Sequence, residues 1–315
     1  MSAHEQRLGL LFAGLCALNG AFVPAVAQLT TAGTDPLAVA TVTSLFAGVA
    51  ALVVLAVRGE IGVLLRGPQV KRLLVVAALG TALAFFLFFE GAKRTTAIQT
   101  ALCLQTEPAY ALIVARVFLG HPMTLRRIAS SALALSGIAL ALGPSRIEAS
   151  SGLVLLLLTP LAWQTSHVVV LRGLRGISPE VLTGARYVFG GAMLAVVLAI
   201  REILGGDDVR GALDGIGAVL PFVVVQGVVL SYFGTAVWYQ AITRLDLART
   251  TAIVVPSVPL LSFLVSFLVL GEVASMQQWL GLMLTAAGVL AFVTAPHAEA
   301  APEIAKSAIR VKAAR

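Results

Sequence analysis

Charged residues are scarce in this chain. Only 12% of its 315 residues are Asp, Glu, Lys or Arg, 59% are hydrophobic, and the mean hydropathy is +0.97. Soluble domains carry about 25% charged residues, and a water-soluble fold of this length cannot bury so much apolar surface. The composition therefore excludes a soluble domain and indicates an integral membrane protein.

Residues that carry catalytic or metal chemistry are also few. The chain has four histidines and two cysteines, and Cys16 and Cys103 both lie in apolar stretches. A disulfide framework or a metal site would need such residues in clusters. The sequence contains no His-Glu-x-x-His, no Gly-x-Ser-x-Gly and no Walker-type Gly-x-x-x-x-Gly-Lys-Ser/Thr motif. We therefore expect no catalytic residues, no cofactor, no metal and no direct use of ATP.

Long apolar stretches are what the sequence does have. A bilayer core about 30 Å thick takes about 20 residues of helix per crossing. Two apolar stretches, 95–118 and 179–201, carry charge inside, and eight others contain no Lys, Arg, Asp or Glu: 8–34, 36–57, 73–89, 128–145, 149–171, 215–243, 250–271 and 273–298. None shows the alternating pattern of a membrane barrel. The sequence therefore predicts an all-α membrane protein with ten transmembrane helices, spans one to ten.

The basic residues are distributed unevenly between the loops. With the N-terminus inside, fifteen Lys and Arg residues fall on the cytoplasmic side and five on the other side: Lys93, Arg94, Arg146, Arg201 and Arg210. Cytoplasmic loops collect basic residues, so we expect a multi-pass protein of the cytoplasmic (inner) membrane with both termini in the cytoplasm. Residues 298–315 then form a basic, disordered cytoplasmic tail. The net charge of +7 reflects this topology, and we expect no nucleic-acid partner.

The two halves of the chain resemble each other. At an offset of 143 residues spans one and two match spans six and seven, and at an offset of 151 spans four and five match spans nine and ten. Matched positions include Gly33 with Gly176, Pro36 with Pro179, Pro108 with Pro259, and Gly137 with Gly288. We predict two five-helix repeats, 1–143 and 144–297. Because five is odd, the second repeat has inverted topology, which suits alternating access to a site near the membrane midplane.

Two motifs carry a resemblance to a known family. The run Leu-x-x-Glu-Pro…Leu-Gly-His-Pro over 104–122 has a counterpart in the second half, formed by Pro259 and by Leu-Gly-Glu over 270–272. Together with ten spans in two halves, this pattern resembles the drug/metabolite transporter superfamily in its ten-helix EamA-type branch, over residues 8 to about 295. The resemblance implies export of amino acids, related metabolites or drugs. His121 departs from the pattern, because it stands where the family often has Glu.

Glu107 is the main candidate for a substrate-binding residue. An ionisable group at the bilayer centre costs about 2.5–3.5 kcal/mol on insertion scales, so it normally faces a cavity or a partner. Polar residues are expected to share its helix face at spacings of three and four: Gln99, Cys103, Thr106 and Tyr110. The functional interpretation is binding of a substrate amine or a proton. The alternative is a carboxylate that fixes a bend at Pro108 or pairs with a basic residue.

Other polar and aromatic side chains lie inside the spans. The predicted substrate-binding set is Asn19, Glu107, Tyr110, Trp163, Gln164, His167 and Tyr232. For each of these, structural packing is the alternative. Arg186 either reaches the cytoplasmic interface or offsets Glu107. Glu90 is expected to form a surface pair with Lys93 or Arg94, and the alternative is a carboxylate that guards the outer mouth. Small-residue rows around Gly137 and Gly288 predict that spans five and ten form a scaffold or a dimer surface.

These observations predict a secondary transporter that exports small metabolites by alternating access, with amino acids, related compounds or drugs as substrates. Two alternatives stay open: a lipid or facilitative carrier of the same fold without ion coupling, and the less favoured intramembrane enzyme. The expected partners are a small-molecule substrate and the lipid bilayer, and a homodimer is also open. The sequence leaves the substrate and any proton coupling undecided.

Overall fold

The structure is a computed structural model that describes residues 3–120, 123–143, 150–174, 176–205, 209–245 and 247–294. Within these residues the regular structure is helical, and ten segments are long and apolar enough to cross a membrane. Their ends differ from the predicted ones by five residues or fewer. The prediction of ten helical spans is confirmed. The predicted tail, 298–315, lies outside the described residues.

Most spans are single α-helices, but three are composite. Span three consists of α4, η1 and α5, span four of α6 and α7, and span eight of α13, η2 and α14, where η1 and η2 are π-helical. The elements are α1 (Ala3–Thr31), α2 (Pro36–Val57), α3 (Ile61–Leu65), α4 (Val70–Ala77), η1 (Ala78–Leu83), α5 (Ala84–Lys93), α6 (Ala97–Leu104), α7 (Glu107–Leu119), α8 (Leu125–Leu142), α10 (Ser151–Gly173), α11 (Pro179–Gly205), α12 (Val209–Leu213), α13 (Ile216–Val224), η2 (Val225–Phe233), α14 (Gly234–Leu245), α15 (Leu247–Leu270) and α16 (Met276–Val293).

Local signals in the sequence set where several helices begin and end. The carboxylate of Asp35 accepts a hydrogen bond from the first turn of α2 at 2.8 Å, as a helix N-cap does. Thr124 and Ser275, which are 151 residues apart, cap α8 and α16 in the same way. Gly120 and Gly271, at the same offset, follow α7 and α15 with φ of +69° and +68°, a conformation that favours glycine. Starts and stops therefore recur at the spacing of the repeat.

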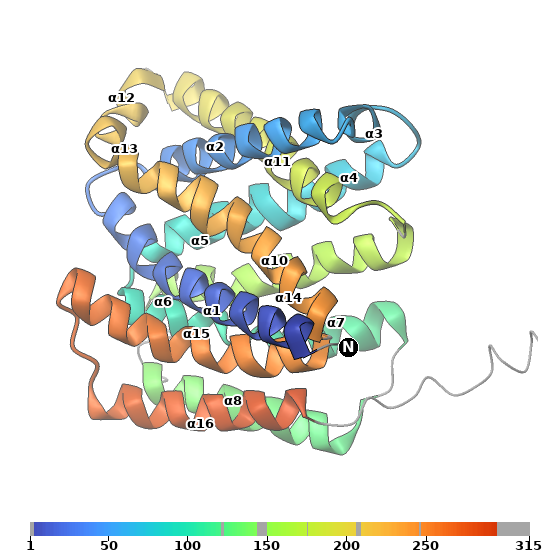
Figure 1. Ribbon diagram of the computed structural model, residues 1–315. Coiled ribbons are helices and arrows are strands. Elements are labelled where there is room, and N and C mark those ends of the chain that lie inside the picture. The colour runs from blue at the N-terminus through green and yellow to red at the C-terminus, as the bar shows by residue number, and fades with distance from the viewer. Residues whose placement is uncertain are drawn as a thin grey trace, which may run out of the picture.

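Two close helix pairs flank the bundle, α2 with α11 on one side and α8 with α16 on the other (Figure 1). Glycines bring α8 and α16 into backbone contact. A Cβ on Gly288 would lie 2.4 Å from the backbone nitrogen of Ala134, and one on Gly137 would lie 2.5 Å from that of Thr285. The small-residue rows of spans five and ten therefore pack against each other within one chain. They form a scaffold and are not available as a dimer surface.

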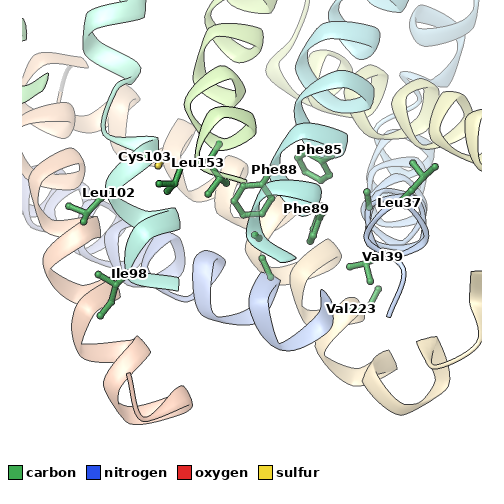
Figure 2. Packing of buried hydrophobic residues seen from close by; sticks show 14 of the residues in the cluster. Leu37, Val39, Phe85, Phe88, Phe89, Ile98, Leu102, Cys103, Leu153 and Val223 are labelled. Carbon is green, nitrogen blue, oxygen red and sulfur yellow. The ribbon is translucent and has the colours of Figure 1, made fainter. Parts of the chain in front are cut away.

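The bundle has two ends, which differ in how they are packed. We call the end where α1 begins and α16 ends the terminal face, and the end where α1 ends and α2 begins the distal face. The main hydrophobic cluster of the distal half joins spans from both halves of the chain (Figure 2), and a smaller one joins α1, α6 and α15 beside it. Members of the main cluster include Leu37 and Val39 of α2, Phe85, Phe88 and Phe89 of α5, Ile98 and Leu102 of α6, Leu153 of α10 and Val223 of α13.

The terminal half is divided between two separate clusters. One contains Leu55, Leu73 and Val181 and joins α2, α3, α4, α10 and α11. The other contains Ala17 and Leu245 and joins α1, α14 and α15. Span four follows this division, because α6 packs against α15 in the distal half whereas α7 packs against α10 and α8. Hydrophobic packing is therefore split between two groups of helices in the terminal half, whereas the main distal cluster joins nearly all spans.

Polar contacts follow the same division. At the distal face the Glu272 carboxylate, just after α15, accepts hydrogen bonds from the first two backbone N–H groups of α6, at 3.0 and 3.1 Å. This contact links the two halves of the chain. At the terminal face the ion pairs stay within each group of helices: Arg58 pairs with Glu180 at 3.1 Å between α2 and α11, and Arg244 with Glu5 at 3.4 Å between α14 and α1.

Candidate functional site

Span four is broken in the middle of the bundle, at Gln105 and Thr106, between α6 and α7. Pro108 has no N–H group, so the carbonyl of Leu104 loses its helical donor. The N–H of Ala109 bonds to the carbonyl of Thr106 at 3.1 Å, so the carbonyl of Gln105 loses its helical donor as well. Two backbone acceptors are thus released at the break. Broken helices of this kind form ligand sites in transporters and channels, where they line a cavity.

Glu107 is the first residue of α7, so its carboxylate lies at this break. Nε2 of Gln164, on α10, donates a hydrogen bond to Oε1 of Glu107 at 2.7 Å. Glu107 is surrounded by protein atoms, yet its side chain is only half-buried. Part of the Glu107 side chain is therefore accessible at the helix break. Its second oxygen, Oε2, is available to a ligand.

The predicted continuous polar stripe on span four is wrong, because the break divides it. Gln99 lies near the distal face, where its side chain completes a capping box with Thr96 at the start of α6. Cys103 is fully buried in the distal cluster. Of the predicted stripe, Tyr110 lies with Glu107 on α7, one turn further on, and is half-buried. The polar surface therefore faces the terminal half only.

The facing surface is provided by α10. Gln164, His167 and Leu171 follow one another at spacings of three and four and so share one helix face. His167 is exposed although protein atoms surround it, and Leu171, nearer the terminal face, is 52% exposed. Trp163 is half-buried beside them, and within the described residues its indole N–H has no hydrogen-bond partner. The face of α10 between Glu107 and the terminal face therefore carries accessible side chains.

Arg186 brings a positive charge to the same region. Its Nη2 donates a hydrogen bond to the carbonyl of Gly80, in η1, at 2.8 Å, and its guanidinium lies 5.8 Å from the centre of the Tyr187 ring. Arg186 also interacts electrostatically with both Glu107 and His167. Of the two interpretations made from the sequence, an arginine that faces Glu107 inside the bundle fits better than one that reaches the interface. Its side chain points into the bundle, toward the carbonyl of Gly80.

The two π-helical segments occupy equivalent spans of the two repeats, three and eight, and sequence reasoning missed both. A polar side chain from the first span of the other repeat holds each composite span. Ser166 of α10 donates Oγ to the carbonyl of Val76 at 3.2 Å, just before η1, and Asn19 of α1 donates Nδ2 to the carbonyl of Val229 in η2 at 2.9 Å. Single π-turns are frequent at functional sites.

The predicted site residues thus fall into two groups. Glu107, Tyr110, Trp163, Gln164 and His167 lie on α7 and α10, around the helix break. Tyr232 lies in η2, and Asn19 donates a hydrogen bond to that segment. Tyr232 also interacts electrostatically with the Arg58–Glu180 ion pair. Outside both groups, Glu90 pairs with Arg94 at 2.6 Å, one turn away on α5, as predicted. Among the described residues, no group of three or more His, Cys, Asp and Glu side chains could hold a metal.

The different packing of the two ends of the bundle predicts chemical labelling from one face only. In a chain with Cys16 and Cys103 replaced by alanine, we expect His167→Cys to react with a membrane-impermeant maleimide much faster from the terminal face than from the distal face. Ser166→Cys is the matched control, because Ser166 has the same depth but is buried against α4. It should stay unlabelled from both faces. Faster labelling of His167→Cys from the distal face would show that the accessible end has been misassigned.

Comparisons with known proteins agree with this architecture. Residues 7–143 and residues 150–294 each match the EamA-like transporter family. A protein of Streptantibioticus cattleyicolor named "Probable terminal-alkyne amino-acid exporter" is 31% identical over 242 residues, which cover 74% of this chain and 76% of that protein. A solved structure titled only "Crystal structure of protein" is 18% identical with a TM-score of 0.63, and the match covers 92% of this chain and 96% of that chain. At that identity it shows the fold alone.

Proposed function

The chain belongs to the EamA-like transporter family, within the drug/metabolite transporter superfamily, and from this premise we propose that it exports amino acids by alternating access. It is a transporter with ten helical spans in two family halves, and not an enzyme. The substrate, the direction of transport and the membrane orientation are the proposed parts. We propose 1–143 and 144–297 as the two halves, and the family matches over 7–143 and 150–294 support this division.

The observation that carries the proposal is the carboxylate at the helix break. Glu107 offers a negative charge inside a membrane bundle, next to two backbone carbonyls that have lost their helical donors. All of these groups are acceptors, so they suit a cationic donor such as a substrate ammonium. Gln164 holds the carboxylate in place and leaves its second oxygen open. An ammonium group is what an amino-acid substrate would present.

The named relative supports the substrate class. It is described as a probable exporter of a terminal-alkyne amino acid, so a substrate with an ammonium group fits both the relative and the site. Tyr110 and Trp163 add aromatic surface next to the carboxylate, which suits an apolar amino-acid side chain. We expect His167 to line the path that such a substrate takes to the terminal face. Asn19 and Tyr232 are proposed to line the path beside η2.

The orientation completes the proposal. The excess of basic residues predicts that the terminal face, with both chain ends, is cytoplasmic, in the cell inner membrane. We infer from the split packing at that face that this conformation is open to the cytoplasm and closed to the outside. This is the state in which an exporter collects its substrate. A homodimer would have to form through lipid-facing surfaces other than the α8–α16 contact.

Exchange in proteoliposomes tests the proposal. Vesicles containing the purified protein and preloaded with unlabelled L-leucine, L-phenylalanine or L-propargylglycine should accumulate the labelled compound from outside, without ATP. Vesicles without protein are the control. Movement of a fluorescent phospholipid between leaflets, with no exchange of any amino acid, would instead support the lipid carrier of the same fold.

A further inference from the structure

Arg186 is a cation without a counter-ion inside the bundle. In the described part of the chain no carboxylate lies within ion-pair distance of its guanidinium. Its Nη2 donates to the carbonyl of Gly80, and its Nε is buried with no hydrogen-bond partner. A charged side chain in a transmembrane segment normally faces a partner or a water-filled cavity. Within the residues that the structure describes, no carboxylate therefore neutralises Arg186 through a direct ion pair.

The surroundings of Arg186 form a second polar centre. A Cβ on Gly80 would lie 2.6 Å from Oγ of Ser166 and 3.2 Å from Nε of Arg186. Ser166 is buried, so its hydroxyl and Gly80 only fix the position of the guanidinium, and a larger residue at position 80 would displace it. A guanidinium binds a carboxylate through two parallel N–H groups. This centre therefore suits a carboxylate in the same way that the helix break suits an ammonium.

Both centres contact the middle of α10. Glu107 accepts a hydrogen bond from Gln164 at 2.7 Å, and Arg186 lies beside Ser166, two positions further along the same helix. Among the described residues Arg186 and Glu107 form no direct ion pair. We propose that Arg186 binds the carboxylate of the substrate while Glu107 binds its ammonium group, which makes the transporter selective for zwitterionic amino acids. This inference rests on the proposed function and adds a specificity-determining residue to it. Amines and organic cations lack the group that Arg186 binds.

Paired substrates separate the role of Arg186 from transport as such. In proteoliposomes the wild-type protein should exchange labelled L-leucine at least tenfold faster than either of two analogues. Isopentylamine is leucine without its carboxylate, and leucinamide has a neutral amide in place of the carboxylate. Arg186→Gln should lose this preference through a fall in leucine exchange of tenfold or more. Arg186→Lys, which keeps the charge but not the planar fork, should retain part of it.

Controls keep the outcomes distinct. Arg172→Gln removes an exposed arginine at the end of α10 and should leave the leucine-to-amine ratio unchanged. Thermal unfolding in detergent shows whether Arg186→Gln is folded, and Arg186→Lys supplies the test if it is not. Leucine exchange by the wild type with an unchanged leucine-to-amine ratio in the Arg186 variants would overturn this inference and leave the proposed function standing. Absence of amino-acid exchange in the wild type would overturn the proposed function itself.

Discussion

Glu107→Gln is expected to lower amino-acid exchange in proteoliposomes by about 10- to 100-fold. The change keeps the size of the side chain but removes the negative charge at the helix break. A hydrogen bond to a charged group contributes about 1.5–3 kcal/mol, which corresponds to this range of rates if the bond is made to the substrate ammonium. The new amide would also face the amide of Gln164, which now donates to the carboxylate at 2.7 Å.

Glu90→Gln is the matched control for this prediction. Glu90 is the same residue type and also lies within a span, but its partner is Arg94, at 2.6 Å, near the distal face. We expect the exchange rate of this variant to stay within about twofold of the wild type, because Arg94 is exposed and an exposed ion pair contributes about 0–1 kcal/mol. Equal losses in the two variants would mean that Glu107 acts on stability and not on the substrate.

Gly288→Ala is expected to destabilise the protein by about 1–3 kcal/mol, the usual cost of overpacking a close contact. The added Cβ would lie 2.4 Å from the backbone nitrogen and 2.8 Å from Cα of Ala134. Backbone atoms on both sides cannot move aside as a flexible side chain can, so α8 and α16 must separate. Thermal unfolding in mild detergent, followed by intrinsic fluorescence, measures the effect as a lower Tm.

Gly14→Ala provides the corresponding control on α1. Nothing lies within 4 Å of the position that its Cβ would take, and alanine favours a helix over glycine by up to about 1 kcal/mol. We expect an unchanged or slightly raised Tm. A similar fall in Tm for both variants would show that glycine substitution in any span, and not the α8–α16 contact, is responsible.

Much of the fold could be predicted because lipid simplifies the problem. Stretches without charge mark the spans, and matched Gly and Pro positions mark the repeat. Gly120 and Gly271 show why those matches are structural, since both follow their helices with positive φ. The distal-face role of Glu272 could not be read in this way, because its carboxylate binds backbone groups of α6 that lie 174 and 175 positions away.

The candidate site was only partly predictable. A lone carboxylate in a span pointed to Glu107, and the structure places Gln164 on it, a pairing that no spacing in the sequence encodes. The sequence predicts a bend at Pro108 and not a break before Glu107, because a proline alone does not tell whether a helix kinks or stops. The segments η1 and η2 consist of ordinary apolar residues with glycine, so their π-helical geometry arises from packing and leaves no local signal. The sequence also identifies Arg186 as a charge inside a span. The orientation of its side chain depends on the hydrogen bond to the carbonyl of Gly80, which the sequence does not reveal.

Equilibrium binding of radiolabelled L-leucine to the purified protein in detergent tests the central claim, that Glu107 and Arg186 form one amino-acid site. We expect saturable binding to the wild type, competition by L-phenylalanine but not by isopentylamine, and loss of binding in both Glu107→Gln and Arg186→Gln. Saturable leucine binding that is unchanged in both folded variants would contradict the account.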